Sequence, residues 1–241
     1  MPASELAATA TLRKDTWWVE PLLIVLGLGA FVVYTTWAAL QGAHFEYKNY
    51  LSPFYSPTLK PSWWPWSPAI LILWGPAGFR LTCYYYRKAY YRSFWWSPPA
   101  CAVRDAHSGY TGETGFPLIL QNIHRYFFYV ATAFLIFLWY DAIYAFIFDG
   151  RFGIGLGSII MVVNVALLSM YSFSCHSCRH LCGGCLDRFS ASPLRYRLWR
   201  MVTTQNEHHM LWAWLSLVSV ALTDVYIRLL SMGMLRDWRL F

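Results

Sequence analysis

The sequence predicts an all-α, polytopic membrane protein. We expect a bundle of five transmembrane helices forming one membrane anchor domain, residues 1–241, with a cytoplasmic N-terminus. Composition supports this class: 57% of the 241 residues are hydrophobic, 20% are aromatic and only 13% are charged. Soluble domains average about 25% charged residues. The apolar residues also gather into long segments separated by polar ones, so most of the surface should face lipid.

Five segments are apolar enough to cross a bilayer, which takes roughly 20 residues of helix. They run over approximately Val19–Leu40, Trp66–Tyr86, Leu118–Phe148, Ile154–Phe173 and Met210–Leu230. The third is long, so we expect it to tilt or to project beyond the membrane. The short sequence DGRFG after it predicts that the third and fourth segments form an antiparallel hairpin. Trp and Tyr crowd the segment ends, as is typical of aromatic rings at headgroup depth.

The distribution of Lys and Arg predicts the orientation. With the N-terminus inside, the inner segments hold Arg13, Lys14, Arg87, Lys88, Arg92, Arg104, Arg179, Arg188, Arg195, Arg197 and Arg200. The outer segments hold Lys48, Lys60, Arg151, Arg236 and Arg239. This bias favours a cytoplasmic N-terminus and an outer C-terminus. The net charge of +7 is therefore mostly a topology signal and does not indicate nucleic-acid binding. The polar N-terminal stretch shows no cleavage site, so we expect no signal peptide.

Potential metal ligands gather at the predicted inner level. The stretch SFSCHSCRHLCGGCLDR, residues 172–188, holds four of the six cysteines at the end of the fourth apolar segment. Thiols stay reduced on a cytoplasmic face, so a disulfide framework is not expected there. Cys83, His124, His208 and His209 lie at the inner ends of other segments. The sequence therefore predicts a metal or redox site made from several helices.

Spacing within this stretch is compatible with three kinds of site. If the fourth helix continues, Cys175, Cys178 and Cys182 share one stripe, and His176 and His180 share an adjoining one. The Gly183–Gly184 pair should end the helix and let Cys185 turn away. The site could be structural zinc, an iron–sulfur cluster of the Rieske type with two Cys and two His, or haem b held by His124 and His209. Buried cysteines that act simply as small apolar residues are the alternative to all three.

A few polar residues lie within the apolar segments, where they are costly and usually functional. Arg80 and Arg125 lie toward the inner side and could extend to the headgroups or hold a quinone carbonyl. Asp141 lies toward the outer side, as do Asp224 and Arg228, whose i, i+4 spacing favours an ion pair. We interpret these outer residues as structural rather than as a proton route.

Several longer motifs resemble a known family. They are TCYYYRKAYYRSFWWSPPACAV, YTGETGFPLILQNIHRYFFY, SCHSCRH, and RYRLW followed by HHMLWAWLSLVSVALTDVYIRLL. Over about residues 65–235 the sequence resembles the single-chain membrane anchor of actinobacterial-type succinate dehydrogenase (complex II). Other five-helix anchors use four His to hold two haems. Here the first segment has no His and the second offers Cys83 instead.

The resemblance implies an integral, multi-pass subunit of the bacterial plasma membrane. Its partners would be a flavoprotein and an iron–sulfur protein on the cytoplasmic face, and the complex would act as a succinate:quinone oxidoreductase. The anchor would relay electrons through a membrane-embedded Rieske-type [2Fe–2S] centre to a quinone, with menaquinone expected. The alternatives are a haem b anchor and a non-redox scaffold with structural zinc.

The resemblance also implies site residues without fixing them. For the cluster we favour Cys175, Cys178, His124 and His209, with His180, His176, His208 and Cys83 in reserve. For the quinone pocket we select Arg80, Tyr84 and Tyr126. Cys182 and Cys185 receive no assigned role, and we expect no catalytic residue for succinate in this chain.

Overall fold

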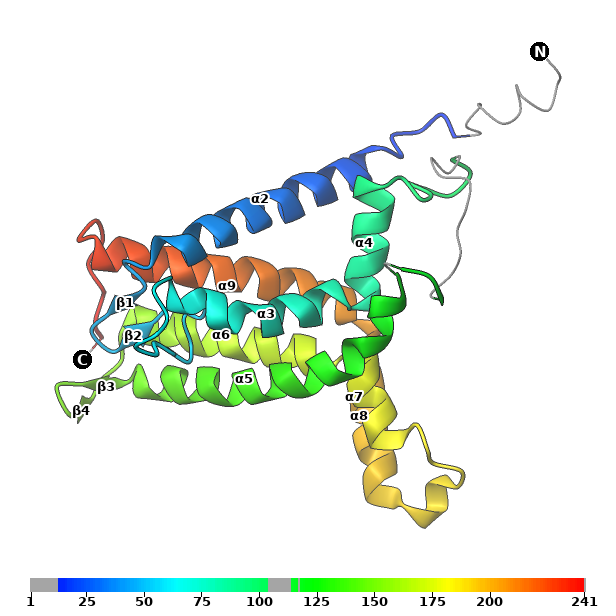
Figure 1. Ribbon diagram of the computed structural model, residues 1–241. Coiled ribbons are helices and arrows are strands. Elements are labelled where there is room, and N and C mark those ends of the chain that lie inside the picture. The colour runs from blue at the N-terminus through cyan, green and yellow to red at the C-terminus, as the bar shows by residue number, and fades with distance from the viewer. Residues whose placement is uncertain (1–12, 104–113, 117, 241) are drawn as a thin grey trace. The chain divides into compact units, whose positions relative to one another are not determined.

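The computed structural model describes residues 13–103, 114–116 and 118–240, which form two compact units (Figure 1). The first unit contains the residues up to Val33 together with Arg80–His124. The second contains Tyr34–Phe79 and Arg125–Phe241. The described residues are mainly helical, as the composition predicts.

The helices are α2 (Val19–Gln41), α3 (Pro68–Leu81), α4 (Tyr84–Phe94), α5 (His124–Tyr144), α6 (Leu156–Phe173), α7 (His176–Gly183), α8 (Pro193–Glu207) and α9 (His209–Ser231). Two 3₁₀ helices are η2 (Leu118–Ile123) and η3 (Phe189–Ala191). Two small antiparallel hairpins pair β1 (Glu46–Tyr47) with β2 (Tyr50–Leu51), and β3 (Ile147–Phe148) with β4 (Arg151–Phe152).

Four stretches of helix are long and apolar enough to cross a membrane: Val19–Gln41, Ile119–Tyr144, Leu156–Phe173 and His209–Ser231. They confirm four of the expected segments to within a few residues at most of their ends. The segment expected at 66–86 contains a shorter apolar helix, α3, of 14 residues. This helix ends early because Cys83 has an extended backbone (φ −67°, ψ 130°) and precedes the separate helix α4.

The third segment also ends earlier than expected. Helix α5 stops at Tyr144, and Ile147–Phe148 pairs as a strand with Arg151–Phe152. Asp149 and Gly150 both have positive φ values, of 50° and 78°, which reverse the chain between the strands. The predicted hairpin between the third and fourth segments is therefore confirmed, but the extra length at 145–148 belongs to its turn.

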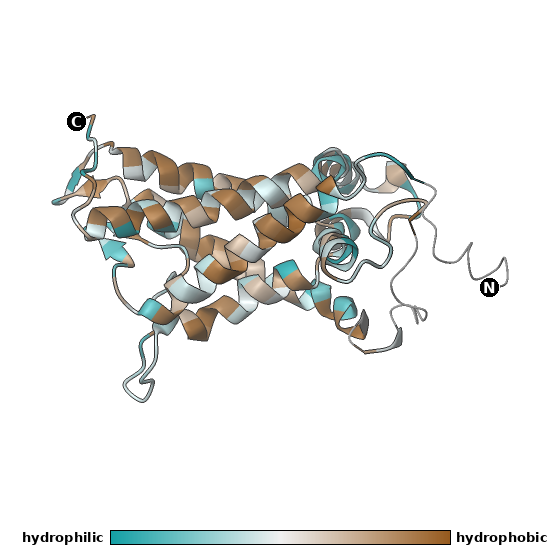
Figure 2. Ribbon diagram, turned by 90° about the horizontal axis from the view of Figure 1, so that it is seen from above, coloured by the Kyte–Doolittle hydropathy of each residue, from teal (hydrophilic) through white to brown (hydrophobic). Residues whose placement is uncertain are grey.

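The core of the second unit is built on α5, α6 and α9. The long helices are hydrophobic along most of their length (Figure 2). The buried side chains of this core include Leu135 on α5, Val165 on α6 and Ile227 on α9, with Tyr50 from β2 at one end. Many large apolar side chains on the same helices remain exposed. A helix that is apolar on all sides is typical of a membrane span with lipid on its outer face.

Helix α3 approaches α5 closely because two of its residues are glycines. A Cβ atom on Gly78 would lie 2.1 Å from the Phe127 ring, and one on Gly75 would lie 2.8 Å from Phe134 and Val130. Small residues let membrane helices pack by direct backbone contact, where van der Waals forces replace the hydrophobic effect. Both glycines are therefore required for this packing.

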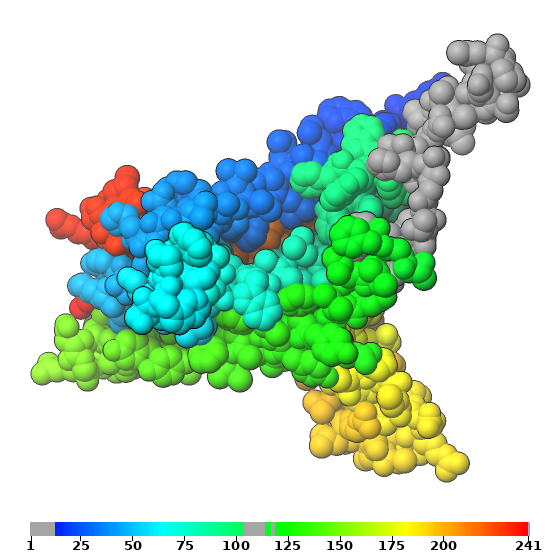
Figure 3. Space-filling model, viewed as in Figure 1, coloured from blue at the N-terminus to red at the C-terminus, as the bar shows by residue number. Residues whose placement is uncertain are grey.

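The chain breaks its helix between α6 and α7, so the continuous stripe expected across this junction does not form. Cys175 has an extended backbone (φ −66°, ψ 148°) and caps α7, whose last residue is Gly183, as the glycine pair predicts. Helix α8 packs along α7. The two helices extend away from α5 in the same unit and form its yellow and gold part (Figure 3).

A buried ion pair joins α9 to the end of α2. Arg228 donates from Nε to Asp224 at 2.6 Å, as their spacing predicts, and both side chains are almost fully buried. The other guanidinium nitrogens donate to the carbonyls of Ala38 and Ala43, each at 2.9 Å. These bonds satisfy carbonyls at the C-terminal end of α2 that no helical N–H can reach.

Asp224 collects two further donors, Tyr34 from α2 at 2.5 Å and Ser52 beside β2. Asp141 accepts from Ser56, which supports the structural role expected for it. Tyr34, Ser52 and Ser56 thus each bond to a carboxylate on another element, as burial in lipid requires.

The first unit contains the N-terminal part of α2, helix α4 and η2. Gln121 links η2 to α4 through a bond of 2.7 Å from its amide to the Tyr90 hydroxyl. Arg80 donates to the Tyr86 hydroxyl at 2.5 Å. Burial raises the pKa of Tyr86 to about 12, so its hydroxyl stays neutral and can accept this bond.

Replacing Arg228 with Ala should destabilise the protein by about 3–5 kcal/mol, because it leaves the Asp224 carboxylate buried without its cation. The double variant Asp224→Asn with Arg228→Gln removes both charges and should lose less stability than Arg228→Ala alone. Thermal unfolding of the detergent-solubilised protein measures both effects. Equal losses in the two variants would contradict a role for charge pairing.

Candidate metal centre

The second unit buries two of the predicted thiols and one predicted imidazole. Cys175 is 1% exposed and caps α7, Cys178 lies within α7, and His209 is the first residue of α9. All three residues are buried. The helix break after Phe173 therefore directs soft ligand atoms inward rather than along one exposed stripe.

A hydrogen-bond network fixes the ring of His209. The Ser174 hydroxyl donates to the Tyr171 carbonyl at 3.0 Å and also lies 2.7 Å from His209 Nδ1. A hydroxyl has one hydrogen, so with that hydrogen on the carbonyl it can only accept from the imidazole. With the Ser174 hydrogen on the carbonyl, His209 Nδ1 is the nitrogen that carries the ring proton. Tyr171 also stacks on the ring, with centroids 5.2 Å apart.

The junction of α6, α7 and α8 is held by two more bonds. Asn206 donates to the Ser174 carbonyl at 2.6 Å, which ties the end of α8 to the end of α6. The Cys175 thiol accepts the Ser177 N–H at 3.2 Å as the N-cap of α7. Ser174 and Cys175 thus have fixed positions.

The Cys178 thiol is in an environment that disfavours its charged form. Burial is the largest cause and raises its pKa well above the usual value, and the neighbouring Cys182 raises it further. The free thiol is therefore protonated at neutral pH. A metal would have to displace that proton, which makes metal binding release protons.

The first unit contains a second imidazole held by a hydroxyl. His124, at the start of α5, is buried, and its Nδ1 lies 2.9 Å from the Thr82 hydroxyl. The next residue, Cys83, is 2% exposed and caps α4. Each unit thus contains a buried Cys directly after a hydroxyl residue that bonds to a buried His.

The structure separates the predicted residues by burial. The four favoured ligands and Cys83 are buried, whereas His176, His180 and His208 are exposed. Cys182 is half-buried and Cys185 is exposed. Within the described part of the chain, no three His, Cys, Asp or Glu side chains form a group that could hold a metal ion. The chemistry, burial and support of the donors fit a Cys- and His-ligated centre, but the described side chains are not gathered into one.

The residues predicted for a quinone pocket are in different settings. Arg80 bonds to Tyr86, and Tyr84 is 43% exposed with the Arg87 guanidinium 5.1 Å from its ring. Tyr126 is 69% exposed on α5 in the second unit. Their role in quinone binding stays a prediction.

Sequence reasoning missed the two hydroxyl residues, Thr82 and Ser174. A signal for them existed, because each directly precedes a cysteine at the end of an apolar segment. Metal-binding imidazoles commonly use their second nitrogen for a hydrogen bond to a neighbouring group. A search for such partners next to the ligands would have found both.

Comparisons with known proteins agree on one family. Residues 19–233 match the profile of the actinobacterial succinate dehydrogenase subunit SdhC. Among solved structures, a chain of the Mycobacterium smegmatis Sdh1 complex in the apo form is 50% identical, with a TM-score of 0.90. The alignment covers 96% of this chain and 94% of that one. No curated protein matches.

Alkylation with maleimide should divide the cysteines by burial. Cys101 and Cys185 are exposed and should react fastest, Cys182 more slowly, and Cys83, Cys175 and Cys178 only after denaturation. The thiolate is the reacting species, so the raised pKa of Cys178 slows it further. Peptide mass spectrometry of the folded chain in detergent measures each site. Labelling of Cys175 as fast as Cys185 would contradict the structure.

Proposed function

The chain belongs to the family of actinobacterial succinate dehydrogenase SdhC subunits, and on this premise we propose that it passes electrons to a quinone through a membrane-embedded [2Fe–2S] centre. Membership makes it an integral, multi-pass membrane anchor, consistent with its four long apolar helices. In this proposal a flavoprotein oxidises succinate, and a soluble iron–sulfur protein delivers the electrons to the anchor. The relative of known structure is a chain of the Mycobacterium smegmatis Sdh1 complex.

The proposed ligands are Cys175 and Cys178 on one iron, with His124 and His209 on the other. Their types match a Rieske-type centre, in which two imidazoles replace two thiolates. When bound, such a centre exchanges single electrons at a higher potential than an all-cysteine cluster, which suits transfer to a quinone. The burial of all four side chains supports the proposal, since a dry environment keeps competing water ligands away.

The hydrogen bond between Ser174 and His209 is the main structural support for this proposal. The Ser174 hydroxyl is placed to accept a hydrogen bond from Nδ1, and the tautomer protonated there is the one that binds a metal through Nε2. The stacked Tyr171 ring limits rotation of the imidazole, so the ligand atom keeps its direction.

Among the reserve ligands, burial favours Cys83. It follows Thr82 as Cys175 follows Ser174, and Thr82 lies beside His124 as Ser174 lies beside His209. The exposed reserves would instead require a ligand atom in contact with solvent. Comparing Cys83→Ser with Cys178→Ser therefore tests which thiol completes the set.

The quinone would be reduced near the same level of the membrane. We propose that Arg80, Tyr84 and Tyr126 contact it, because guanidinium and phenol groups donate to quinone carbonyls. The exposed faces of Tyr84 and Tyr126 leave their rings accessible to a ligand that arrives through lipid. Menaquinone remains the expected species.

Replacing His124 and His209 together with Ala should leave the complex assembled but unable to reduce quinone, while succinate still reduces a soluble dye at the partner subunits. The purified variant should lack two iron atoms and two acid-labile sulfides per complex. It should also lack an EPR signal of low average g value.

The matched control is His44→Ala, which changes an exposed histidine whose Nδ1 lies 3.4 Å from the Ser231 hydroxyl in the second unit. This control should keep the iron, the signal and the activity. Zinc without extra iron in the native complex would favour a structural zinc scaffold, and a sharp Soret band would favour haem b. Quinone reduction retained by the double variant would overturn the proposed ligands.

Replacing Ser174 with Ala should weaken metal retention about 10- to 100-fold, as expected when a hydrogen-bond partner of a ligand is removed. Titration with a chelator, followed by iron analysis, measures the loss. Thr132→Ala is the control, because its hydroxyl also bonds to a helix carbonyl, that of Phe128 at 2.9 Å, but on α5 away from His209. Equal iron retention in the two variants would show that the bond between Ser174 and His209 does not support an iron ligand.

A further inference from the structure

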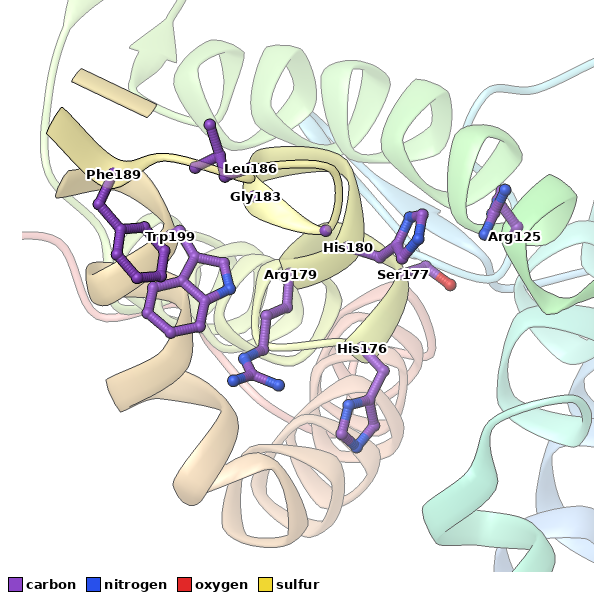
Figure 4. Close-up of a pocket in the computed structure, with 10 residues that line it drawn as sticks. Arg125, His176, Ser177, Arg179, His180, Gly183, Leu186, Phe189 and Trp199 are labelled. Atoms are coloured by element: carbon purple, nitrogen blue, oxygen red, sulfur yellow. The ribbon is translucent and has the colours of Figure 1, made fainter. Parts of the chain in front are cut away.

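A cationic pocket lies between α5, α7 and α8 of the second unit, beside the thiol-bearing turn. It is a cavity of about 520 Å³ whose lining includes Arg125, Arg179, His176, His180 and Trp199 (Figure 4). Arg125 comes from the first turn of α5 and lies across from Ser177 and His180 on α7 (Figure 4). The pocket thus combines positive side chains from separate helices.

Close packing between α7 and α8 builds one wall of this pocket. A Cβ atom on Gly183 would lie 2.5 Å from Trp199, so only glycine lets the indole pack against α7. The Arg179 guanidinium carbon lies 5.0 Å from the Trp199 ring, and its Nε donates to Thr203 at 3.0 Å. Arg179 is therefore held in place with further N–H groups on its guanidinium.

The charge of the pocket is not neutralised by the chain. No acidic side chain lines it, and neither Arg125 nor Arg179 forms an ion pair with any residue that the structure describes. Two guanidinium groups that line one cavity give it a positive potential, which favours an anion. Guanidinium groups bind phosphate particularly well, through charge-assisted hydrogen bonds.

The position of the pocket indicates which kind of molecule would supply an anion to it. Arg125 is the second residue of α5, within the first third of the apolar stretch Ile119–Tyr144, and α7 begins three residues after Phe173, the last residue of the α6 span. Both ends therefore lie where a bilayer has its headgroups. Leu186 and Phe189 add apolar lining, and Phe173 and Leu181 are exposed nearby in sequence. Phosphate next to acyl chains is the chemistry that matches both features.

We propose that this pocket binds the headgroup phosphate of an anionic phospholipid. Arg125 and Arg179 supply the charge, and His176 and His180 add ring nitrogens that can donate. Basic pockets beside membrane helices bind such headgroups in other proteins. The bound lipid would connect the start of α5 to the α7–α8 pair, so it would brace the elements that carry Cys175 and Cys178.

The test uses the whole complex, reconstituted in nanodiscs of phosphatidylcholine with a minority of phosphatidylglycerol. After extraction into detergent, native mass spectrometry counts the phosphatidylglycerol retained per complex. Arg125→Gln and Arg179→Gln should each lower retention about fivefold, and the double variant more. Arg125→Lys and Arg179→Lys keep the charge and should restore most of the retention. Arg197→Gln, an exposed arginine on α8 outside the pocket, should change nothing.

Three results would overturn the proposal. Equal retention in the double Gln variant and the wild type would show that the lipid binds elsewhere. Displacement of the lipid by inorganic phosphate at equal concentration would show a site for free phosphate. Loss of the partner subunits from the double Gln variant with the lipid still bound would assign the pocket to a subunit contact. Retention of the partner subunits by each Gln variant, seen in the same spectra, excludes misfolding as the cause of lost lipid.

Discussion

A chain in lipid must satisfy its own backbone polar groups, and this constraint explains where the chemistry of this protein lies. Within a span every N–H and C=O is paired along the helix, so a soft ligand there would need its own buried partners. At a break in the helix the backbone opens, and neighbouring side chains can bond to it. Ser174 and Cys175 lie at such a break, with the Ser174 carbonyl bonded to Asn206 and its hydroxyl to Tyr171. The candidate centre therefore depends on the end of α6.

The proposed redox centre and the proposed lipid site share one short piece of structure. Helix α7 presents Cys178 inward, while His180 and Arg179 face the cavity beside α8. A rigid support is valuable for a redox ligand, since small displacements change its potential and its access to water. Gly183 and Trp199 provide that rigidity by direct contact between the helices. One helix of eight residues thus links the interior of the unit to its boundary with the headgroups.

Much of this arrangement could be predicted from the sequence, because lipid imposes simple rules on length and hydrophobicity. Four spans, the hairpin after α5, the Asp224–Arg228 pair and the end of α7 at the glycines were all predictable. The early end of α3 was not, because an apolar pattern does not reveal that Cys83 leaves the helix. The roles of Ser174 and Thr82 were missed because a hydroxyl is unremarkable until its partner is known. Pairing between distant helices is a tertiary property that local patterns do not contain.

The ion pair of Arg228 also bears on how the chain enters the membrane. Charged residues within a span are costly to insert, and here the compensating groups lie on α2 and next to β2, far earlier in the chain. Helix α9 inserted on its own would lack those groups. Helix α9 is therefore stable in the membrane only after the earlier segments are in position. Those segments are also the ones that are synthesised first. The last span, α9, therefore depends on the first, α2, for its stability in the membrane.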